Sequence, residues 1–224
     1  MELSDKTLQV LKNYSTINSN LVIRPGSTLS TISEAKNVLA SVDVDENFEQ
    51  EFGVYDLGEF LGVLGLVDRP NLKFEKEYVM VSDSSGRSRV KYFYSDPDML
   101  TTTTKSVTMP APDVKFELDE DTLGRIKRAA STLGHNEVFI TGKDGVIVLT
   151  VMSSENQTAN AYSIEVAGEF PSHDFSFILS IPNLKLMAGA YDVSISSKLI
   201  SQFVNKETGM SYFIALEKTS TFGV

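Results

Sequence analysis

Apolar residues recur at helical spacing through residues 119–134, which read DEDTLGRIKRAASTLG. Four of them lie three or four positions apart and therefore form one stripe: Leu123, Ile126, Ala130 and Leu133. Asp119 is a suitable N-cap, and Gly134 is suited to the left-handed residue that ends many helices. The pattern predicts an amphipathic helix with its apolar stripe toward a core.

The opposite side of this helix is predicted to be cationic. Each residue of an α-helix turns by about 100°, which places Arg125, Arg128 and Thr132 away from the stripe and Lys127 on its flank. The 224-residue chain nevertheless has a net charge of −10. Two interpretations remain open: the face is an ordinary solvated surface, or something anionic lies along it.

The rest of the chain alternates strand and helix patterns. Further helices are predicted at 3–14, 56–67 and 181–187, the last capped by Ser180 and ended by Gly189. Gly58, Gly62 and Gly65 weaken the second of these on propensity, so we expect another backbone to approach it closely. Residues 45–51 are predicted to be an acidic loop. Strands are predicted in the first half at 20–24, 28–32, 38–44, 52–55, 72–74, 78–82 and 87–94, and in the second half at 137–141, 146–152, 160–167, 175–179, 191–196, 199–204 and 212–217.

The order of helix, strands, helix and strands occurs twice. Leu3, Thr7 and Leu11 align at constant spacing with Leu118, Thr122 and Ile126. Between the halves, residues 95–112 are rich in Thr and Pro and are predicted to be a linker. We therefore expect an α+β fold with two similar domains, 1–108 and 109–224, each with antiparallel sheets and helices on one face.

Composition narrows the class of protein. The absence of cysteine rules out a disulfide framework and fits a reducing cytosol. No apolar run approaches the length of about 20 residues that a membrane helix needs, and residues 1–9 lack the pattern of a signal peptide. The net negative charge should repel nucleic acid unless the basic residues are gathered in one place.

No constellation of residues predicts catalysis. His135 and His173 are isolated, and neither has metal-ligand spacing. Residues 43–54 begin like a calcium loop, but Phe48 and Val54 stand where the glycine and the bidentate glutamate belong. Ser33 and Lys36 match SxxK without its companion motifs. We expect no catalytic residue, no metal site and no cofactor.

The cations on the predicted helices are the remaining signal. If the four helices share one face, six cations gather there: Lys6, Lys12, Arg125, Lys127, Arg128 and Lys185. Each taken alone is an ordinary exposed helix residue. The repeat favours the anion-facing interpretation, because helices of both halves carry cations outward.

The chain resembles the sliding clamps of DNA replication, most closely those of T-even-type phages. The resemblance is carried by LSDKTLQVLKNYSTINSN (3–20), VYDLGEFLGVLGLV (54–67), Ser95-Asp96-Pro97, IPNLKLMAGAYDVS (181–194) and YFIALE (212–217). It covers essentially the whole chain. Residues 27–51 and 205–209 diverge from the family.

The resemblance implies a homotrimeric ring around duplex DNA, with helices lining the hole and the six cations facing DNA without regard to sequence. It also implies that the ring tethers the replicative DNA polymerase and is opened by an ATP-dependent clamp loader. It implies no membrane association, and action in the host cytoplasm if the chain is phage-encoded.

Two further sites follow from the resemblance. Head-to-tail ring closure implies two different edge strands, placed at Arg89, Lys91 and Phe93 on one side and at Ala161, Ser163 and Val166 on the other. A hydrophobic pocket for partner tail peptides is placed at Leu39, Val42, Met99, Leu100 and Phe222. The alternative is an acidic structural or assembly protein that does not bind DNA. An unrecognised hydrolase is a weaker third hypothesis.

Overall fold

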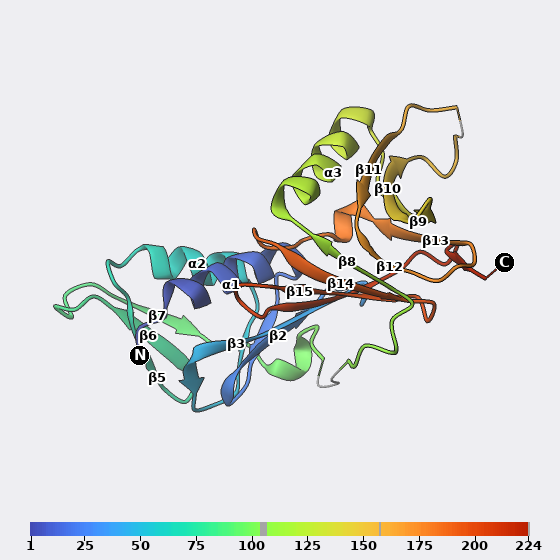
Figure 1. Cartoon of the computed structure of the whole chain (residues 1–224). Helices are drawn as coiled ribbons and strands as arrows, with labels where there is room; N and C mark the ends of the chain where they lie inside the picture. Colours follow the sequence, from blue (N-terminus) through green and yellow to red (C-terminus); the bar gives the residue numbers. More distant parts are fainter. Residues whose placement is uncertain (104–106, 157, 224) are drawn as a thin grey trace. The chain divides into compact units, whose positions relative to one another are not determined.

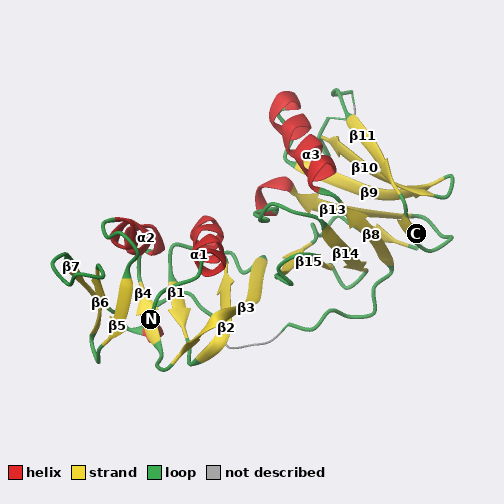
Figure 2. Cartoon of the chain, turned by 60° about the vertical axis from the view of Figure 1, so that its left-hand side comes forward, coloured by secondary structure: helices red, strands yellow, loops and turns green. Residues whose placement is uncertain are grey.

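The computed structural model of the chain describes residues 1–103, 107–156 and 158–223. The chain divides into two units, Met1–Lys105 and Ser106–Val224, shown in Figures 1 and 2. Positions 104–106 of the predicted linker lie outside the described residues. The strand pairs named below are all antiparallel, which confirms the predicted α+β class. In the described part of the chain, no helix is both long and apolar enough to cross a membrane.

The first unit combines two α-helices with three groups of paired strands. β1 pairs with β4, β2 with β3, and β6 with both β5 and β7. Its elements are α1 (Asp5–Ile17), β1 (Leu21–Ile23), β2 (Gly26–Ile32), β3 (Val38–Phe48), β4 (Phe52–Val54), α2 (Leu57–Gly65), β5 (Asn71–Phe74), β6 (Tyr78–Ser82), β7 (Arg89–Phe93) and the 3-10 helix η1 (Pro97–Met99).

The core of the first unit lies between α1, α2 and the strands. α1 starts at the N-cap Ser4, whose hydroxyl accepts a hydrogen bond from the backbone N–H of Thr7. The helix buries Val10, Leu11 and Tyr14 against α2 and β3. The second half of β3 alternates between buried and exposed side chains, so it turns one row of side chains toward the core.

The prediction of an acidic loop at 45–51 is wrong in its first part. β3 continues to Phe48, and its burial alternates, so that Val44, Glu46 and Phe48 point inward while Asp45 and Asn47 are exposed. Glu46 looked like a loop residue because it is charged. Its carboxylate instead accepts hydrogen bonds from the backbone N–H of Ser4 and the hydroxyl of Thr7 at the start of α1.

The expected close approach to the glycines of α2 is also wrong. A Cβ added at Gly62 or Gly65 would meet no atom within 4 Å, and one at Gly58 would meet only the Asp56 carboxylate. These glycines lie on the exposed side of the helix. α2 forms because Leu57, Phe60 and Leu64 are buried and Asp56 caps its first turn.

The second unit places α3 over two sheets. The strand orders are β11–β10–β9–β13–β17 and β12–β8–β14–β15–β16. Its elements are β8 (Val114–Leu118), α3 (Glu120–Leu133), β9 (Glu137–Lys143), β10 (Val146–Met152), β11 (Tyr162–Val166), β12 (Gly168–Glu169), β13 (Phe175–Ser180), the 3-10 helix η2 (Ile181–Asn183), β14 (Tyr191–Ser196), β15 (Ile200–Asn205), β16 (Ser211–Ala215) and β17 (Thr221–Phe222).

The predicted helix at 181–187 is absent from the structure. η2 ends at Asn183, and the chain then runs without helix to Gly189, whose φ is 123°. Leu184 and Leu186 are both buried, a spacing of two that suits an extended chain rather than a helix. The backbone N–H of Ile181 donates to the carbonyl of Asn136, which holds this segment against the start of β9.

Candidate functional site

The helix α3 has the two faces that its sequence predicts. Asp119 accepts from the backbone N–H of Thr122 at the N-terminus, and Gly134 closes the C-terminus with φ 71°. Leu123, Ile126 and Ala130 are buried, and α3 packs on β10 and β11. Leu133, predicted to complete the stripe, is only half-buried.

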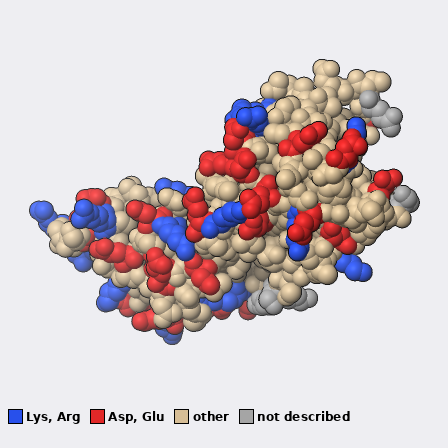
Figure 3. All heavy atoms as spheres, in the orientation of Figure 1, with Lys and Arg blue, Asp and Glu red and all other residues tan. Residues whose placement is uncertain are grey.

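The exposed face of α3 is not purely cationic, which corrects the prediction. Arg125 Nη2 lies 2.7 Å from Asp121 Oδ2, and Arg128 Nη2 lies 3.8 Å from Asp121 Oδ1. The hydrogen bond and negative charge of Asp121 raise the pKa of Arg125. Figure 3 shows Lys and Arg over the middle of α3 with acidic groups directly beside them. One carboxylate therefore offsets part of the charge of two arginines.

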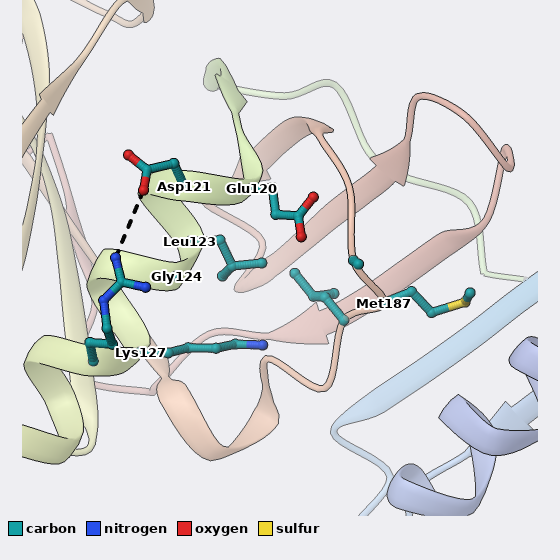
Figure 4. Close-up of a pocket in the computed structure, with 9 residues that line it drawn as sticks. Glu120, Asp121, Leu123, Gly124, Lys127 and Met187 are labelled. Atoms are coloured by element: carbon teal, nitrogen blue, oxygen red, sulfur yellow. Dashed lines mark ion pairs between the residues drawn. The ribbon is translucent and has the colours of Figure 1, made fainter.

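Lys127 lies on the flank of α3 and is half-buried. Burial lowers its pKa. Together with Leu123 and Met187 it lines a pocket of about 650 Å³ between α3 and the segment after η2. Figure 4 shows its side chain extending across this pocket toward the Met187 segment. The lysine is thus less exposed than the two arginines.

The other predicted DNA-facing cations differ in position and exposure. Lys185 follows η2 instead of lying on a helix, and it is half-buried. In the first unit, Lys12 is exposed on α1, whereas Lys6 Nζ donates to the backbone carbonyl of Asp43 over 3.0 Å. The structure thus brings Arg125, Lys127 and Arg128 together on α3 and places Lys6 and Lys12 on α1.

The residues predicted for a peptide pocket do not share one environment. Leu39 and Val42 are both buried in β3. They are three positions apart in a regular strand, so their side chains point to opposite faces of the sheet. Leu100 is 7 % exposed, whereas Met99 is 83 % exposed. Phe222 stacks on Phe177 in the second unit, at 5.8 Å between ring centroids.

Leu100 has a packing role that its sequence position did not reveal. Its Cδ1 atom lies 2.8 Å from the point where a Cβ of Gly53 would stand. The backbone N–H of Ser95 also donates to the carbonyl of Gly53 over 2.9 Å. The glycine therefore gives the start of the linker room to pack on β4. Of the two neighbours Met99 and Leu100, only Met99 is exposed enough to contact a partner.

β7 and β11 are two of the edge strands of the sheets in the part of the chain that the structure describes. β7 pairs only with β6, and β11 pairs only with β10. Arg89, Lys91 and Phe93 share the exposed face of β7, and Lys91 Nζ lies 4.8 Å from the centroid of the Tyr78 ring. Phe93 is 63 % exposed, which is unusual for an aromatic side chain on a solvated strand.

The β11 edge differs in charge and shape from the β7 edge. Ala161 precedes the strand, Ser163 is exposed, and Val166 is half-buried. Glu165 gives this edge an acidic group, in contrast to the basic β7. A groove of about 360 Å³ between α3 and β11 is lined in part by Leu133 and Tyr162. The sequence pattern does not predict this groove, because it assigns Leu133 to the core.

The candidate metal motif of the sequence lies in regular structure. Residues 43–48 are strand rather than loop. Asp43, Asp45 and Asn47 share its exposed face but are spread along an extended chain instead of wrapping around one point, and Glu46 is buried on the other face. Among the described residues, no group of three metal-ligating side chains occurs. His135 Nε2 lies 2.8 Å from the carbonyl of Asn160, and the ring of His173 packs edge-on against Phe222 at 4.5 Å.

Comparison with protein families matches both halves of the chain. A family described as DNA polymerase processivity factor matches residues 4–107, and one described as gp45 sliding clamp, C terminal, matches residues 115–218. A protein of Vibrio phage KVP40 named Sliding clamp is 31% identical over 97% of this chain and 99% of its own length. Proteins with the same name from Escherichia phage RB69 and Enterobacteria phage T4 are 27% and 26% identical, each over 99% of both chains.

Solved structures share the fold at low identity. The PCNA of A. fulgidus, solved with the C-terminal region of FEN-1, aligns with a TM-score of 0.72 at 13% identity over 98% of both chains. The pol III beta of Caulobacter crescentus aligns with a TM-score of 0.71 at 12% identity, over 97% of this chain and 65% of that one. The PCNA of Entamoeba histolytica aligns with a TM-score of 0.67 at 14% identity, over 94% of both chains.

Proposed function

Because the chain belongs to the sliding clamps, the family of DNA polymerase processivity factors, we propose that it encircles duplex DNA and tethers a replicative polymerase to it. A clamp holds DNA by topology and so needs only weak, sequence-blind attraction to phosphates. The family matches favour this function over the alternative of an acidic structural or assembly protein that does not bind DNA. We further propose that the chain acts without catalytic residue, metal or cofactor of its own.

One observation carries the proposal: α3 packs its apolar side on the sheet and presents Arg125 and Arg128 to the outside. The family model covers this helix. On an acidic chain, an outward pair of arginines on a rigid helix marks the surface that an anionic polymer approaches. Lys6, Lys12, Lys127 and Lys185 are proposed as additional DNA-facing groups, with Lys6, Lys127 and Lys185 in a lesser role because all three are half-buried.

The assembly that we propose is a homotrimeric ring closed head to tail. Each chain contributes two units, so three chains supply six. A head-to-tail contact needs two unlike edges, and β7 and β11 supply them. Arg89 and Lys91 on one edge complement Glu165 on the other, and Phe93 offers an apolar group beside Ala161, Ser163 and Val166 of the next copy.

The proposed partners are the replicative polymerase and an ATP-dependent clamp loader, in the cytoplasm of the host cell. A solved neighbour, the PCNA of A. fulgidus, carries the C-terminal region of FEN-1, so binding of a partner's terminal segment by this fold has a precedent. For this chain, Met99 is the proposed contact near the linker because it is exposed. Leu39, Val42, Leu100 and Phe222 are proposed as supporting groups.

Primer extension on a long single-stranded template tests the proposal. The chain is added to the polymerase and clamp loader of its own source with ATP, under conditions that allow one binding event per polymerase. We expect product length to increase with the chain and to stay short without the loader. Unchanged product length in the presence of loader and ATP would contradict the proposal.

A further inference from the structure

Asp121 shares one stripe of α3 with both outward arginines. Residues 121, 125 and 128 stand at positions i, i+4 and i+7, so their side chains lie above one another on the same side of the helix. Asp121 contacts both: 2.7 Å separates its Oδ2 from Arg125 Nη2, and 3.8 Å separates its Oδ1 from Arg128 Nη2. The three side chains are all more than half exposed, so DNA phosphates have access to this cluster.

Gly124 makes the second of these contacts feasible. Arg128 reaches back along the helix toward Asp121 and passes over position 124. A Cβ at that position would stand 3.2 Å from Arg128 Nη1, which is closer than ordinary van der Waals contact. The missing side chain at Gly124 therefore lets the guanidinium group of Arg128 lie flat along the helix.

We propose that Asp121 is an internal counter-ion that holds Arg125 and Arg128 along the surface of α3 and competes with DNA phosphates for them. The proposal rests on the proposed function, in which this face meets DNA. A phosphate that binds either arginine must displace the carboxylate, so each contact is weaker and shorter-lived than one with a free arginine. The consequence is weak binding of DNA by this face, which suits a ring that must move along DNA.

Glu120 provides a matched control for the charge of Asp121. It is the preceding residue, it lies in the same first turn, and it is exposed. Figure 4 shows it pointing away from Asp121, toward the Met187 segment. Among the ion pairs of the described residues, Glu120 takes part in none. Glu120→Gln therefore removes the same charge from the same turn without releasing an arginine.

The test is the salt dependence of binding to a short fluorescent DNA duplex, measured by anisotropy on the assembled full-length protein over a range of KCl concentrations. The slope of log K against log[KCl] reports the number of phosphates neutralised, at about 0.9 per contact. For Asp121→Asn we expect a slope steeper by between about 0.9 and 1.8, for one or both arginines. Affinity at low salt should rise by up to about fivefold, the range of an exposed charge pair.

A second variant separates the two arginines and guards against a folding defect. Gly124→Ala should displace Arg128 alone, since Arg125 does not cross position 124, and should steepen the slope by up to about 0.9. Alanine also favours the helix over glycine, so this variant should fold. Thermal unfolding of each variant checks that the fold is kept.

Equal slopes for Asp121→Asn and Glu120→Gln would overturn the inference and leave the proposed function intact, because charge alone would then explain the effect. Slopes for Asp121→Asn and Gly124→Ala that match the wild type would overturn it as well. A wild-type protein whose binding shows no salt dependence would overturn the inference together with the DNA-facing role of α3.

Discussion

The hydroxyl of Thr7 in α1 donates a hydrogen bond to the carboxylate of Glu46 in β3, 39 residues away. Both residues are buried. The same carboxylate accepts from the backbone N–H of Ser4, the N-cap of α1. A negative charge at the start of a helix also interacts favourably with the helix dipole. Glu46 thus fixes the first turn of α1, the helix that presents Lys6 and Lys12.

Removal of the charge at Glu46 should destabilise the first unit. We expect Glu46→Gln to lower the free energy of unfolding by about 1.5–3 kcal/mol, the range for hydrogen bonds to charged groups. Urea denaturation measures the change. Asp45→Asn is the control, since Asp45 lies next to Glu46 but is exposed on the other face of β3, and it should change stability by less than about 0.5 kcal/mol. Equal losses would contradict the role assigned to Glu46.

The stability contributed by Glu46 should depend on pH. Burial raises the pKa of its carboxyl, but the hydrogen bonds from Thr7 and Ser4 lower the pKa by more, so the pKa lies below the ordinary 4.5. A lowered folded-state pKa stabilises the fold fully above the unfolded-state value and progressively less as the pH falls below it. Acid titration of the urea midpoint should therefore show that the wild type loses its advantage over Glu46→Gln below about pH 4.5. A constant difference at lower pH would contradict this.

Gly62 should be replaceable with a gain in stability. It lies within α2 on the exposed side, and a Cβ there would meet no atom within 4 Å. Gly62→Ala should raise the free energy of unfolding by up to about 1 kcal/mol, because alanine is the better helix former. Chemical denaturation measures it, with Gly134→Ala as the contrasting variant. Gly134 has a φ of 71°, so alanine there should destabilise.

The β11 edge should be needed for assembly. We expect Val166→Lys to weaken the trimer, because a positive charge would face the basic Arg89 and Lys91 of the neighbouring copy in the proposed contact. Sedimentation velocity measures the oligomer. Val166 is half-buried in its own sheet, so Ser163→Lys serves as a second variant that places a positive charge at an exposed position of the same edge. Thermal unfolding shows whether each variant still folds. An unchanged oligomer in both would remove β11 from the interface.

The sequence predicts α3 well because its signals are local. Asp119, the apolar stripe and Gly134 act within one helix. The structure confirms the cap at each end and the buried stripe, except that Leu133 at the end of the stripe is not buried. The alternation of apolar and polar residues likewise predicts most of the strands. β8 was missed although Val114, Phe116 and Leu118 alternate, because it directly follows the irregular linker.

Two failures of prediction have the same physical cause, which is a partner distant in sequence. Glu46 reads as loop until its partner Thr7 is known. Residues 181–187 have enough apolar groups for a helix, but the backbone bond from Ile181 to Asn136 and the burial of Leu184 and Leu186 favour an extended path. The packing of Leu100 on Gly53 also depends on a partner distant in sequence, and the role of Leu100 in a peptide pocket stays a prediction. The pairing of Asp121 with Arg125 was foreseeable from their i, i+4 spacing.

Charge reversal on α3 separates the DNA-facing role from folding. Arg125→Glu combined with Arg128→Glu should weaken loading on DNA and leave the oligomer unchanged, because both side chains are exposed and away from the buried stripe. Gel-filtration mass and DNA retention are measured on the same sample. Loss of the oligomer instead would mean that this face of α3 lies in the subunit contact.

Retention on circular DNA tests the central claim, that the chain encircles DNA, most directly. The labelled protein is loaded onto nicked circular duplex with clamp loader and ATP, separated from free protein at high salt, and then treated with an enzyme that cuts the circle once. High salt screens the weak phosphate contacts, so only topology should hold the protein. We predict stable retention on the circle and rapid release after linearisation. Equal retention on circular and linear DNA, or release from both, would contradict encirclement.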